Sequence, residues 1–201
     1  MKIKPNLVIA DLERYLKLYN ISLSKDSKKT LTDIENFAYE CDNPVNYELF
    51  FSKVIENSKH VQEILLNKGA NPRLISLVLE KHYYKLIDEM SSYSEIDYSY
   101  SKIDGREISG KTAIIDRALE YSVKRNRNTL ENEDIILAAM DEYENNLIQD
   151  DNLYWRDKRL ENCDTTLSHI CGDYDERLWI RFDDIREALI FNKTCEMVEV
   201  A

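Results

Sequence analysis

Two stretches of this chain carry the same pattern: NPVNYELFFSKVIEN at residues 43–57 and NTLENEDIILAAMDE at residues 128–142. In each stretch a short polar turn leads to a glutamate, Glu48 or Glu133, and then to an apolar run that closes on acidic residues. Each stretch also follows an amphipathic segment that contains an alanine. Because self-similarity at a fixed offset marks a repeated supersecondary unit, the sequence predicts two copies of one scaffold.

The spacing of apolar residues outside these stretches predicts an all-α fold. Apolar side chains recur at helical intervals along most of the chain, and 201 residues contain only four Gly and three Pro. We expect the following organisation: an N-terminal amphipathic helix in residues 1–22, a first repeat in 23–90, a linker in 91–107, a second repeat in 108–191, and a tail in 192–201.

Several residues predict where the helices begin and end. Ser24 and Ser58 are suited to cap the helices that follow them, because a serine hydroxyl accepts a hydrogen bond from a free amide of the first turn. Gly69 predicts a helix end, since glycine adopts the left-handed conformation at least cost. The pair Asn71-Pro72 predicts the start of the next helix. A last helix is expected over residues 176–191.

Composition narrows the class of partner. The chain has 38 acidic against 27 basic residues, a formal net charge of −11, which argues against nucleic acid and anionic lipid as partners. No apolar run approaches membrane-spanning length. The four cysteines have no framework spacing and are typical of reduced thiols. We therefore expect a cytoplasmic protein.

The two copies differ in length. Glu48 and Glu133 stand 85 positions apart, whereas Gly69 and Gly172 stand 103 apart, so the second copy carries an insertion of about 18 residues near 146–163. The insertion contains an aromatic and basic cluster: Tyr154, Trp155, Arg156, Lys158 and Arg159. Because loops carry function and such side chains anchor interfaces, this cluster is a candidate partner-binding loop. The alternative is that Trp155 packs back on the helices.

A nucleotide-binding signature overlaps the start of the second copy. The string GREISGKT at residues 105–112 matches GxxxxGK[ST], with Gly105, Gly110, Lys111 and Thr112 in the defining positions. Residues 135–142 resemble the apolar strand and acid of a Walker B segment. A phosphate-binding loop, however, must leave a buried strand of a parallel sheet, and residues 93–104 are too polar for one. A small P-loop NTPase is therefore kept as an alternative function.

The other groups of reactive residues give weaker evidence for a metal site or a catalytic site. Cys163, His169 and Cys171 have no fourth partner at a spacing typical of zinc sites. His60 and His82 have no nearby Cys or Ser that would form a nucleophile–base pair. We therefore expect no catalytic residues, no metal site and no cofactor.

The repeat has the order of features found in one known family. The first copy reads LS at 23–24, FA at 37–38, PVNYEL at 44–49 and KGANP at 68–72, and the second reads IS at 108–109, Ala118, TLENED at 129–134 and CGD at 171–173. Over about residues 23–190 this resembles the Clp repeat, the paired four-helix unit of the N-terminal domain of Clp-type AAA+ unfoldases. The resemblance implies a pseudo-two-fold bundle of two four-helix repeats that binds a substrate or an adaptor protein without catalysis.

The resemblance also implies site residues. In some members the turn glutamate and the cap residue of each repeat line a pocket for phosphorylated arginine, which here would pair Glu48 with Ser24 and Glu133 with Ser109. Glu131 and Asp134 add negative charge beside the second pair, which would repel a phosphate. The alternative is that both glutamates are helix N-terminal carboxylates stabilised by the helix dipole.

Residues 127–138 also look like the loop and last helix of a histone fold. That fold requires a long central helix before the loop, and Gly105 and Gly110 interrupt the segment where it would lie. The negative charge argues against DNA as a partner. A histone-fold-like interaction protein is the third alternative.

Overall fold

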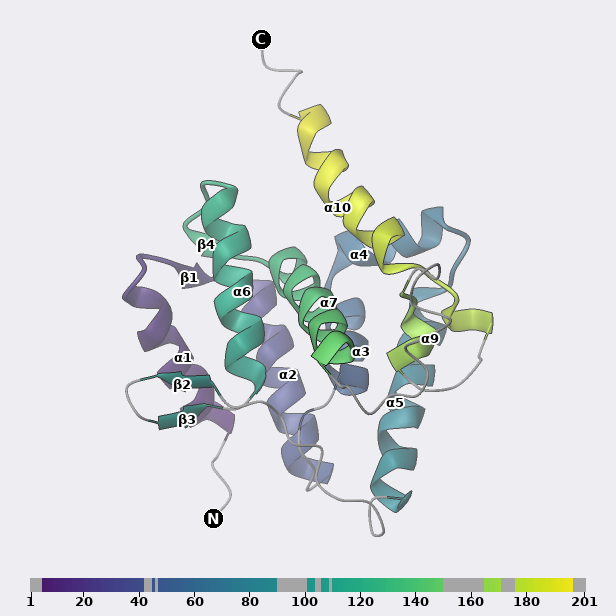
Figure 1. The fold of residues 1–201 in the computed structure, drawn as a ribbon, viewed down its shortest axis with the longest axis horizontal. Helices are drawn as coiled ribbons and strands as arrows, with labels where there is room; N and C mark the ends of the chain where they lie inside the picture. Colours follow the sequence, from purple (N-terminus) through teal and green to yellow (C-terminus); the bar gives the residue numbers. More distant parts are fainter. Residues whose placement is uncertain are drawn as a thin grey trace.

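The computed structural model of the chain describes the backbone of residues 5–41, 45, 47–89, 101–103, 106–108, 110–149, 165–170 and 176–196. These residues are mostly helical, and their strands are two or three residues long (Figure 1). The predicted all-α character is therefore confirmed. None of the described helices has the length and the apolar run that crossing a lipid bilayer requires.

The chain opens with helix α1 (Pro5–Lys17), the short strand β1 (Ser22–Leu23) and helix α2 (Lys25–Cys41). Helix α1 lies where the sequence predicted an N-terminal amphipathic helix. Ser24 caps α2 as predicted, because its hydroxyl oxygen accepts a hydrogen bond from the Ser27 backbone N–H at 3.1 Å.

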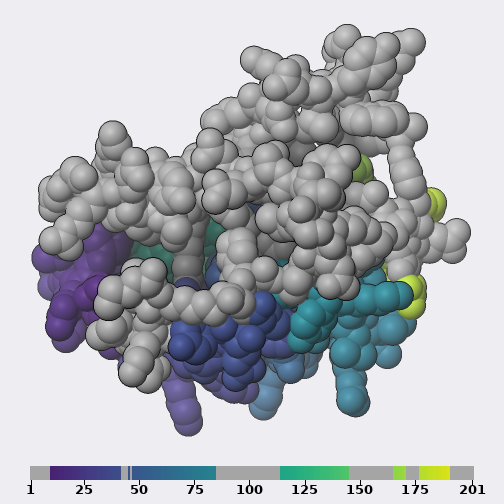
Figure 2. Space-filling model, turned by 90° about the horizontal axis from the view of Figure 1, so that it is seen from below, coloured from purple at the N-terminus to yellow at the C-terminus, as the bar shows by residue number. Residues whose placement is uncertain are grey.

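Helix α3 (Tyr47–Asn57) is the centre of the fold. Every residue from 48 to 55 is buried, on all faces of the helix. Helices α2 and α5 (Pro72–Glu89) pack against it, as does the shorter α4 (Lys59–Asn67). Figure 2 shows the lower face of the molecule, with the purple surface of α1 at one end and the teal surface of α5 at the other.

The predicted ends of α4 and α5 are confirmed. The Ser58 hydroxyl accepts a hydrogen bond from the Val61 N–H at 3.3 Å and so caps α4. Gly69 follows α4 with a φ of +77°, the left-handed conformation that favours glycine. Helix α5 begins at Pro72, and the Asn71 side-chain oxygen accepts a hydrogen bond from the Leu74 N–H.

The second half begins with an antiparallel strand pair, β2 (Ser101–Ile103) and β3 (Arg106–Ile108), followed by helix α6 (Gly110–Lys124). Strand β4 (Thr129–Leu130) then leads into helix α7 (Asn132–Gln149). Strand β4 pairs with β1 in parallel, with Ser22 opposite Thr129 and Leu23 opposite Leu130. This pairing joins the N-terminal segment to the turn of the second copy.

The C-terminal part differs from the prediction of one helix over residues 176–191. A 3₁₀ turn, η1 (Glu176–Leu178), is followed by a break, and helix α10 (Phe182–Glu196) begins only afterwards. The break arises because Arg181 pairs with Thr166, just before the short helix α9 (Leu167–Ile170). The Leu167 N–H donates to the Ile180 carbonyl, and the Phe182 N–H to that of Thr165. These bonds hold the backbone extended.

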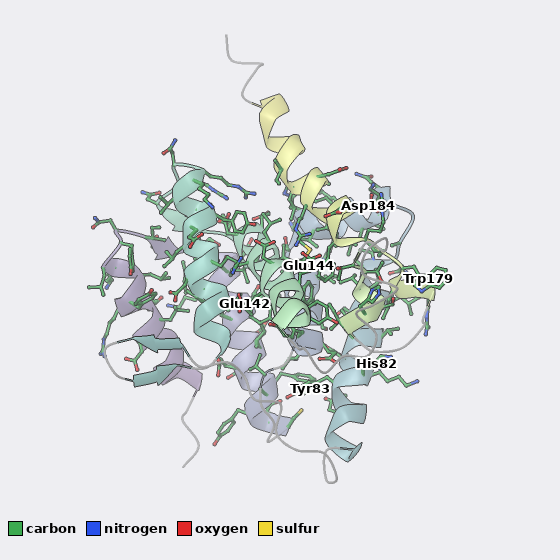
Figure 3. All side chains as sticks on the ribbon, in the orientation of Figure 1. His82, Tyr83, Glu142, Glu144, Trp179 and Asp184 are labelled. Carbon is green, nitrogen blue, oxygen red and sulfur yellow. The ribbon has the colours of Figure 1, made fainter. Side chains whose placement is uncertain are left out.

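Helix α10 is anchored on both halves of the protein. The ring of Phe182 stacks on that of Phe51 in α3 with centroids 5.6 Å apart. Arg186 forms ion pairs with Asp141 and Glu144 of α7, and Lys68 at the end of α4 pairs with Asp184 at 2.9 Å. Figure 3 labels Asp184 and Glu144 along this contact.

Helices α3 and α7 run antiparallel in the core. At one end the rings of Tyr47 and Tyr143 meet edge to face with centroids 5.1 Å apart. At the other end the Asn132 side chain donates to the Asn57 carbonyl at 3.5 Å. The start of α3 therefore lies beside the second half of α7, and the end of α3 lies beside the start of α7.

The two similar stretches of sequence each lie in a helix–turn–helix pair. Helices α2 and α3 form one helix–turn–helix pair and α6 and α7 the other, with Glu48 and Glu133 each the second residue of its helix. Strands β2 and β3 lie in and beside the expected linker, and α7 continues to Gln149.

A buried ion cluster fixes the turn between α6 and α7. Asp134 is completely buried, and its carboxylate contacts Arg125 at 3.1 Å and Arg127 at 2.6 Å. It also accepts the Glu131 N–H at 3.0 Å, which caps the start of α7. Burial raises the pKa of Asp134, and the Glu131 N–H and both guanidinium groups act in the opposite direction. The turn geometry therefore depends on this carboxylate.

Replacing Asp134 with alanine should lower the free energy of unfolding by about 3 kcal/mol, because it leaves two partly buried guanidinium groups without their shared carboxylate. Urea denaturation followed by circular dichroism measures the change. Asp11→Ala is the control: Asp11 also pairs with an arginine, at 3.1 Å, but is 75% exposed, so its loss should cost less than about 0.5 kcal/mol. Equal losses in both variants would contradict this role for Asp134.

Candidate functional site

The first predicted site residue, Glu48, lies in the protein core. Its exposed fraction is 7%. Burial raises the pKa of its carboxyl to about 7, and a hydrogen bond from its own backbone amide lowers it by less. A carboxylate in this position is poorly placed to meet a partner from solvent.

Glu133 lies where the two halves of the chain meet. Its carboxylate is 3.3 Å from Nδ1 of His60, near the start of α4. The adjacent Asn132 is buried, and its side-chain oxygen has no hydrogen-bond partner within the described residues. Both side chains belong to the contact between α7 and the α3–α4 connection.

The hydroxyl of Ser24 is occupied by the start of its own helix. It accepts from the Ser27 N–H and donates to the Ser27 hydroxyl at 2.9 Å. The Ser24 backbone N–H donates to the Leu130 carbonyl at 3.1 Å, so Ser24 lies against the turn of the second copy. The structure thus brings Ser24 close to the turn that precedes Glu133. Ser109 lies outside the described residues.

The expectation that Asp134 repels a phosphate does not fit its surroundings. Its negative charge is balanced by Arg125 and Arg127, and the carboxylate is completely buried. Glu131 accepts a hydrogen bond from the Thr129 hydroxyl at 3.1 Å. The sequence suggested repulsion because it does not show that the turn folds both arginines onto one carboxylate.

The residues of the nucleotide-binding signature do not form the required geometry where they are described. Gly110 is the first residue of α6, and the strand before it, β3, is antiparallel to β2. Residues 135–142 belong to helix α7 and not to a strand. Asp141, the Walker B acid, is bound to Tyr121 and Arg186. Gly105 and the side chains of Lys111 and Thr112 lie outside the described part.

The structure bears only in part on the partner-binding loop and on the histone-fold alternative. The partner-binding loop residues Tyr154, Trp155, Arg156 and Arg159 lie outside the described residues. The helix before the histone-like loop, α6, has 15 residues, far shorter than a long central helix. Within the described side chains, no group of three or more His, Cys, Asp or Glu is arranged to hold a metal ion.

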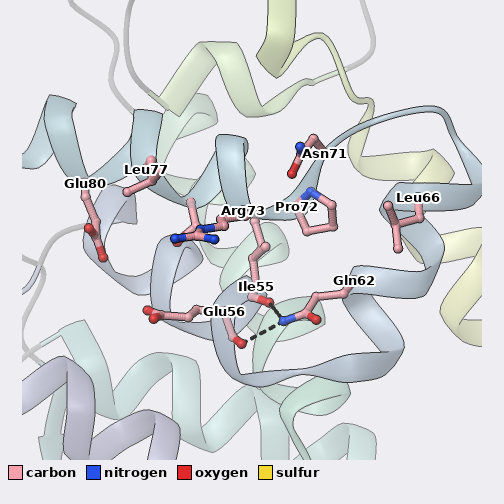
Figure 4. Close-up of a pocket in the computed structure, with 10 residues that line it drawn as sticks. Ile55, Glu56, Gln62, Leu66, Asn71, Pro72, Arg73, Leu77 and Glu80 are labelled. Atoms are coloured by element: carbon pink, nitrogen blue, oxygen red, sulfur yellow. Dashed lines mark hydrogen bonds between the residues drawn. The ribbon is translucent and has the colours of Figure 1, made fainter.

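The structure adds a site that the sequence reasoning missed. A groove of about 570 Å³ lies between the end of α3, helix α4 and the first turns of α5 (Figure 4). Its lining comprises Ile55, Glu56, Gln62, Leu66, Asn71, Pro72, Arg73, Ser76, Leu77 and Glu80. Leu66 and Leu77 are 59% and 54% exposed, whereas Ile55 is fully buried. The groove is therefore open, with leucines at its rim and the buried Ile55 and Ser76 in its lining.

The charged groups of the groove largely balance one another. Lys53 is buried beneath it, and its ammonium lies 2.6 Å from Glu80 and 3.0 Å from Glu56. Burial alone would lower the pKa of Lys53, but the two carboxylates outweigh burial and raise it. Arg73 also lines the groove, so the two cations Lys53 and Arg73 balance the charge of the two carboxylates.

One sequence signal for this groove was available. Helix α4 buries Val61, Ile64 and Leu65 but also carries Leu66, and α5 buries Ile75, Val78 and Leu79 but also carries Leu77. A leucine beside a complete apolar stripe faces away from the core. Sequence alone does not show that two such leucines, on different helices, flank the same groove.

The burial of Glu48 predicts a pH dependence of stability. The carboxyl has a pKa of about 7 in the folded protein, against an ordinary value of 4.5 in the unfolded chain, so the folded state binds more protons between these values. Stability should therefore fall as the pH rises through this window, by about 2 kcal/mol between pH 5 and pH 8. Glu48→Gln should remove this decline, as measured by urea denaturation at both pH values.

The exposed Glu63 supplies the control, since Glu63→Gln should leave the decline unchanged. The other titrating groups are common to all three proteins and cancel in the comparison. A decline of the same size in Glu48→Gln and in the unsubstituted protein would show that Glu48 is not its source.

Comparison with known proteins gives no further guide to these sites. No family model matches the chain, and it matches neither a curated protein nor a solved structure.

Proposed function

We propose that this protein is a non-catalytic binding module that holds a segment of another protein in the groove between α3, α4 and α5. In keeping with the resemblance to the Clp repeat, the partner would be a substrate or an adaptor of an unfoldase or protease system. The observation that carries the proposal is the open groove itself, with exposed leucines at its rim and a buried isoleucine in its lining.

The shape of the groove favours a protein segment over a small molecule. A small-molecule site encloses most of its ligand's surface. Here Leu66 and Leu77 are more exposed than buried, so a bound molecule would lie across the surface and cover them. Apolar side chains of a partner that fill such a surface supply binding energy as they leave water.

The polar groups near the groove support binding rather than catalysis. Lys53 forms ion pairs with both Glu56 and Glu80 in a compact ion cluster. The Ser52 hydroxyl shares hydrogen bonds with Ser76, at 2.8 Å between the two side-chain oxygens. Groups held in this way position helices α3 and α5 but present no free nucleophile or base.

The groove is a better binding surface than the predicted Ser24–Glu48 pair, because Glu48 is buried and the Ser24 hydroxyl caps α2. The Clp-type reading is supported by two helix–turn–helix units whose second helices, α3 and α7, pack antiparallel with a glutamate at the same position. A complete pseudo-two-fold bundle of two four-helix repeats is part of the proposal.

Replacing Leu66 and Leu77 with serine should weaken the binding of an unfolded protein, because the partner then loses the apolar rim. The probe is reduced, carboxymethylated α-lactalbumin, which stays unfolded, and its affinity is measured by fluorescence anisotropy. Each variant should weaken binding about tenfold, since covering a leucine contributes about 1.5 kcal/mol or more.

Leu18→Ser is the matched control. Leu18 is 78% exposed and lies in the turn after α1, outside the groove lining. Its replacement should leave the affinity within about twofold, a change worth less than about 0.5 kcal/mol. Equal affinities in all three variants and the unsubstituted protein would contradict a binding role for the groove.

A second experiment addresses the NTPase alternative. Because a ligand that binds only the folded state raises its melting temperature, Mg-ATP should leave the Tm unchanged if the string at 105–112 binds no nucleotide. Differential scanning fluorimetry measures the Tm of the unsubstituted protein and of Lys111→Ala. An Mg-ATP-dependent rise that Lys111→Ala abolishes would favour the NTPase.

A further inference from the structure

The polar side chains of the groove indicate what kind of segment fits it. Two amides, Gln62 from α4 and Asn71 from the start of α5, line the groove in Figure 4. Each amide is fixed by backbone groups on one side only. The remaining side of each determines which hydrogen bonds a bound molecule can make.

The orientation of Gln62 is set by two carbonyl groups of α3. Its side-chain nitrogen donates to the carbonyls of Ile55 at 2.9 Å and Glu56 at 2.7 Å. Because only the nitrogen of the amide can donate, the oxygen must take the other position. That oxygen has no partner within the described residues, and it is available to accept a hydrogen bond from a ligand.

In Asn71 it is the side-chain oxygen, and not the nitrogen, that is bound to the protein. Its side-chain oxygen accepts the Leu74 N–H at 3.2 Å as the cap of α5. The side-chain nitrogen therefore takes the remaining position and can donate. The groove lining thus includes one free acceptor and one free donor, which come from different helices.

We infer that the groove binds an uncharged, apolar peptide segment in an extended conformation. Gln62 and Asn71 form hydrogen bonds with the main chain of that segment. This inference rests on the proposed function. An extended segment presents free N–H and C=O groups, one for each amide. A helix has bonded these groups internally and cannot use them. The balance of Glu56 and Glu80 against Lys53 and Arg73 favours an uncharged segment.

The inference has a consequence for selectivity. Main-chain hydrogen bonds carry no information about side chains, and the exposed leucines contact any apolar side chain of suitable size. The groove should therefore accept many different extended apolar segments. A folded protein that displays a helix should be rejected.

Asn71→Asp tests the donor. Aspartate caps a helix as well as asparagine does, so α5 keeps its start, but the free position now accepts instead of donating. Gln62→Lys tests the acceptor, because an ammonium can still donate to the Ile55 and Glu56 carbonyls but cannot accept. Asn67→Asp is the charge-matched control: Asn67 is exposed on α4 and outside the lining.

The probe is the neutral peptide acetyl-Gly-Ser-Val-Leu-Thr-Leu-Ser-Gly-amide, with its affinity measured by calorimetry. Asn71→Asp and Gln62→Lys should each weaken its binding about tenfold, as expected for a lost hydrogen bond whose partner stays desolvated. N-methylation of the central residues of the peptide should weaken binding to a similar degree. Asn67→Asp should bind it within about twofold of the unsubstituted protein.

The outcomes separate this inference from the proposed function. Unchanged affinity in both Asn71→Asp and Gln62→Lys, while Leu66→Ser and Leu77→Ser weaken binding, would overturn the main-chain hydrogen bonds and leave the groove as the binding surface. Tighter binding of a hydrocarbon-stapled helical peptide of the same composition would also overturn it. Unchanged affinity in all four variants would overturn both.

Discussion

The burial of residues 48–55 of α3 is the constraint on which the rest of the structure depends. A helix buried on all faces must be covered on every side, and α2, α4, α5 and α7 supply that cover. Its polar residues must find partners inside the protein. Ser52 finds them at Ser76, and Lys53 at Glu80, both on α5. These bonds fix the position of α5 along α3.

The groove is a consequence of that arrangement. Helices α4 and α5 both pack on α3 and are joined by a tight turn at Gly69. Their inner faces meet the core, and their outer edges leave a groove above Ile55 near the end of α3. The ion cluster that stabilises the α3–α5 contact also supplies the charges of the groove. The same residues therefore hold the fold together and determine which segment suits the groove.

The features that the sequence predicted correctly are local ones. The caps at Ser24 and Ser58, the helix end at Gly69 and the restart at Pro72 each follow from hydrogen bonding or backbone preference within a few residues. The features that it missed depend on contacts across the fold. The late start of α10 requires Arg181 to pair with Thr166, and the groove requires leucines of two helices to flank the same surface.

Hydrogen–deuterium exchange of the full chain, with and without excess reduced, carboxymethylated α-lactalbumin, tests most directly whether the groove is the binding surface. The proposed site predicts slower exchange at the end of α3, through α4 and in the first turns of α5, which together line the groove. Exposed apolar side chains also lie outside this segment, including Leu18 in the turn after α1 and Val123 near the end of α6. Protection confined to the turn after α1 and the end of α6, with α4 and α5 unchanged, would contradict the groove as the site of binding.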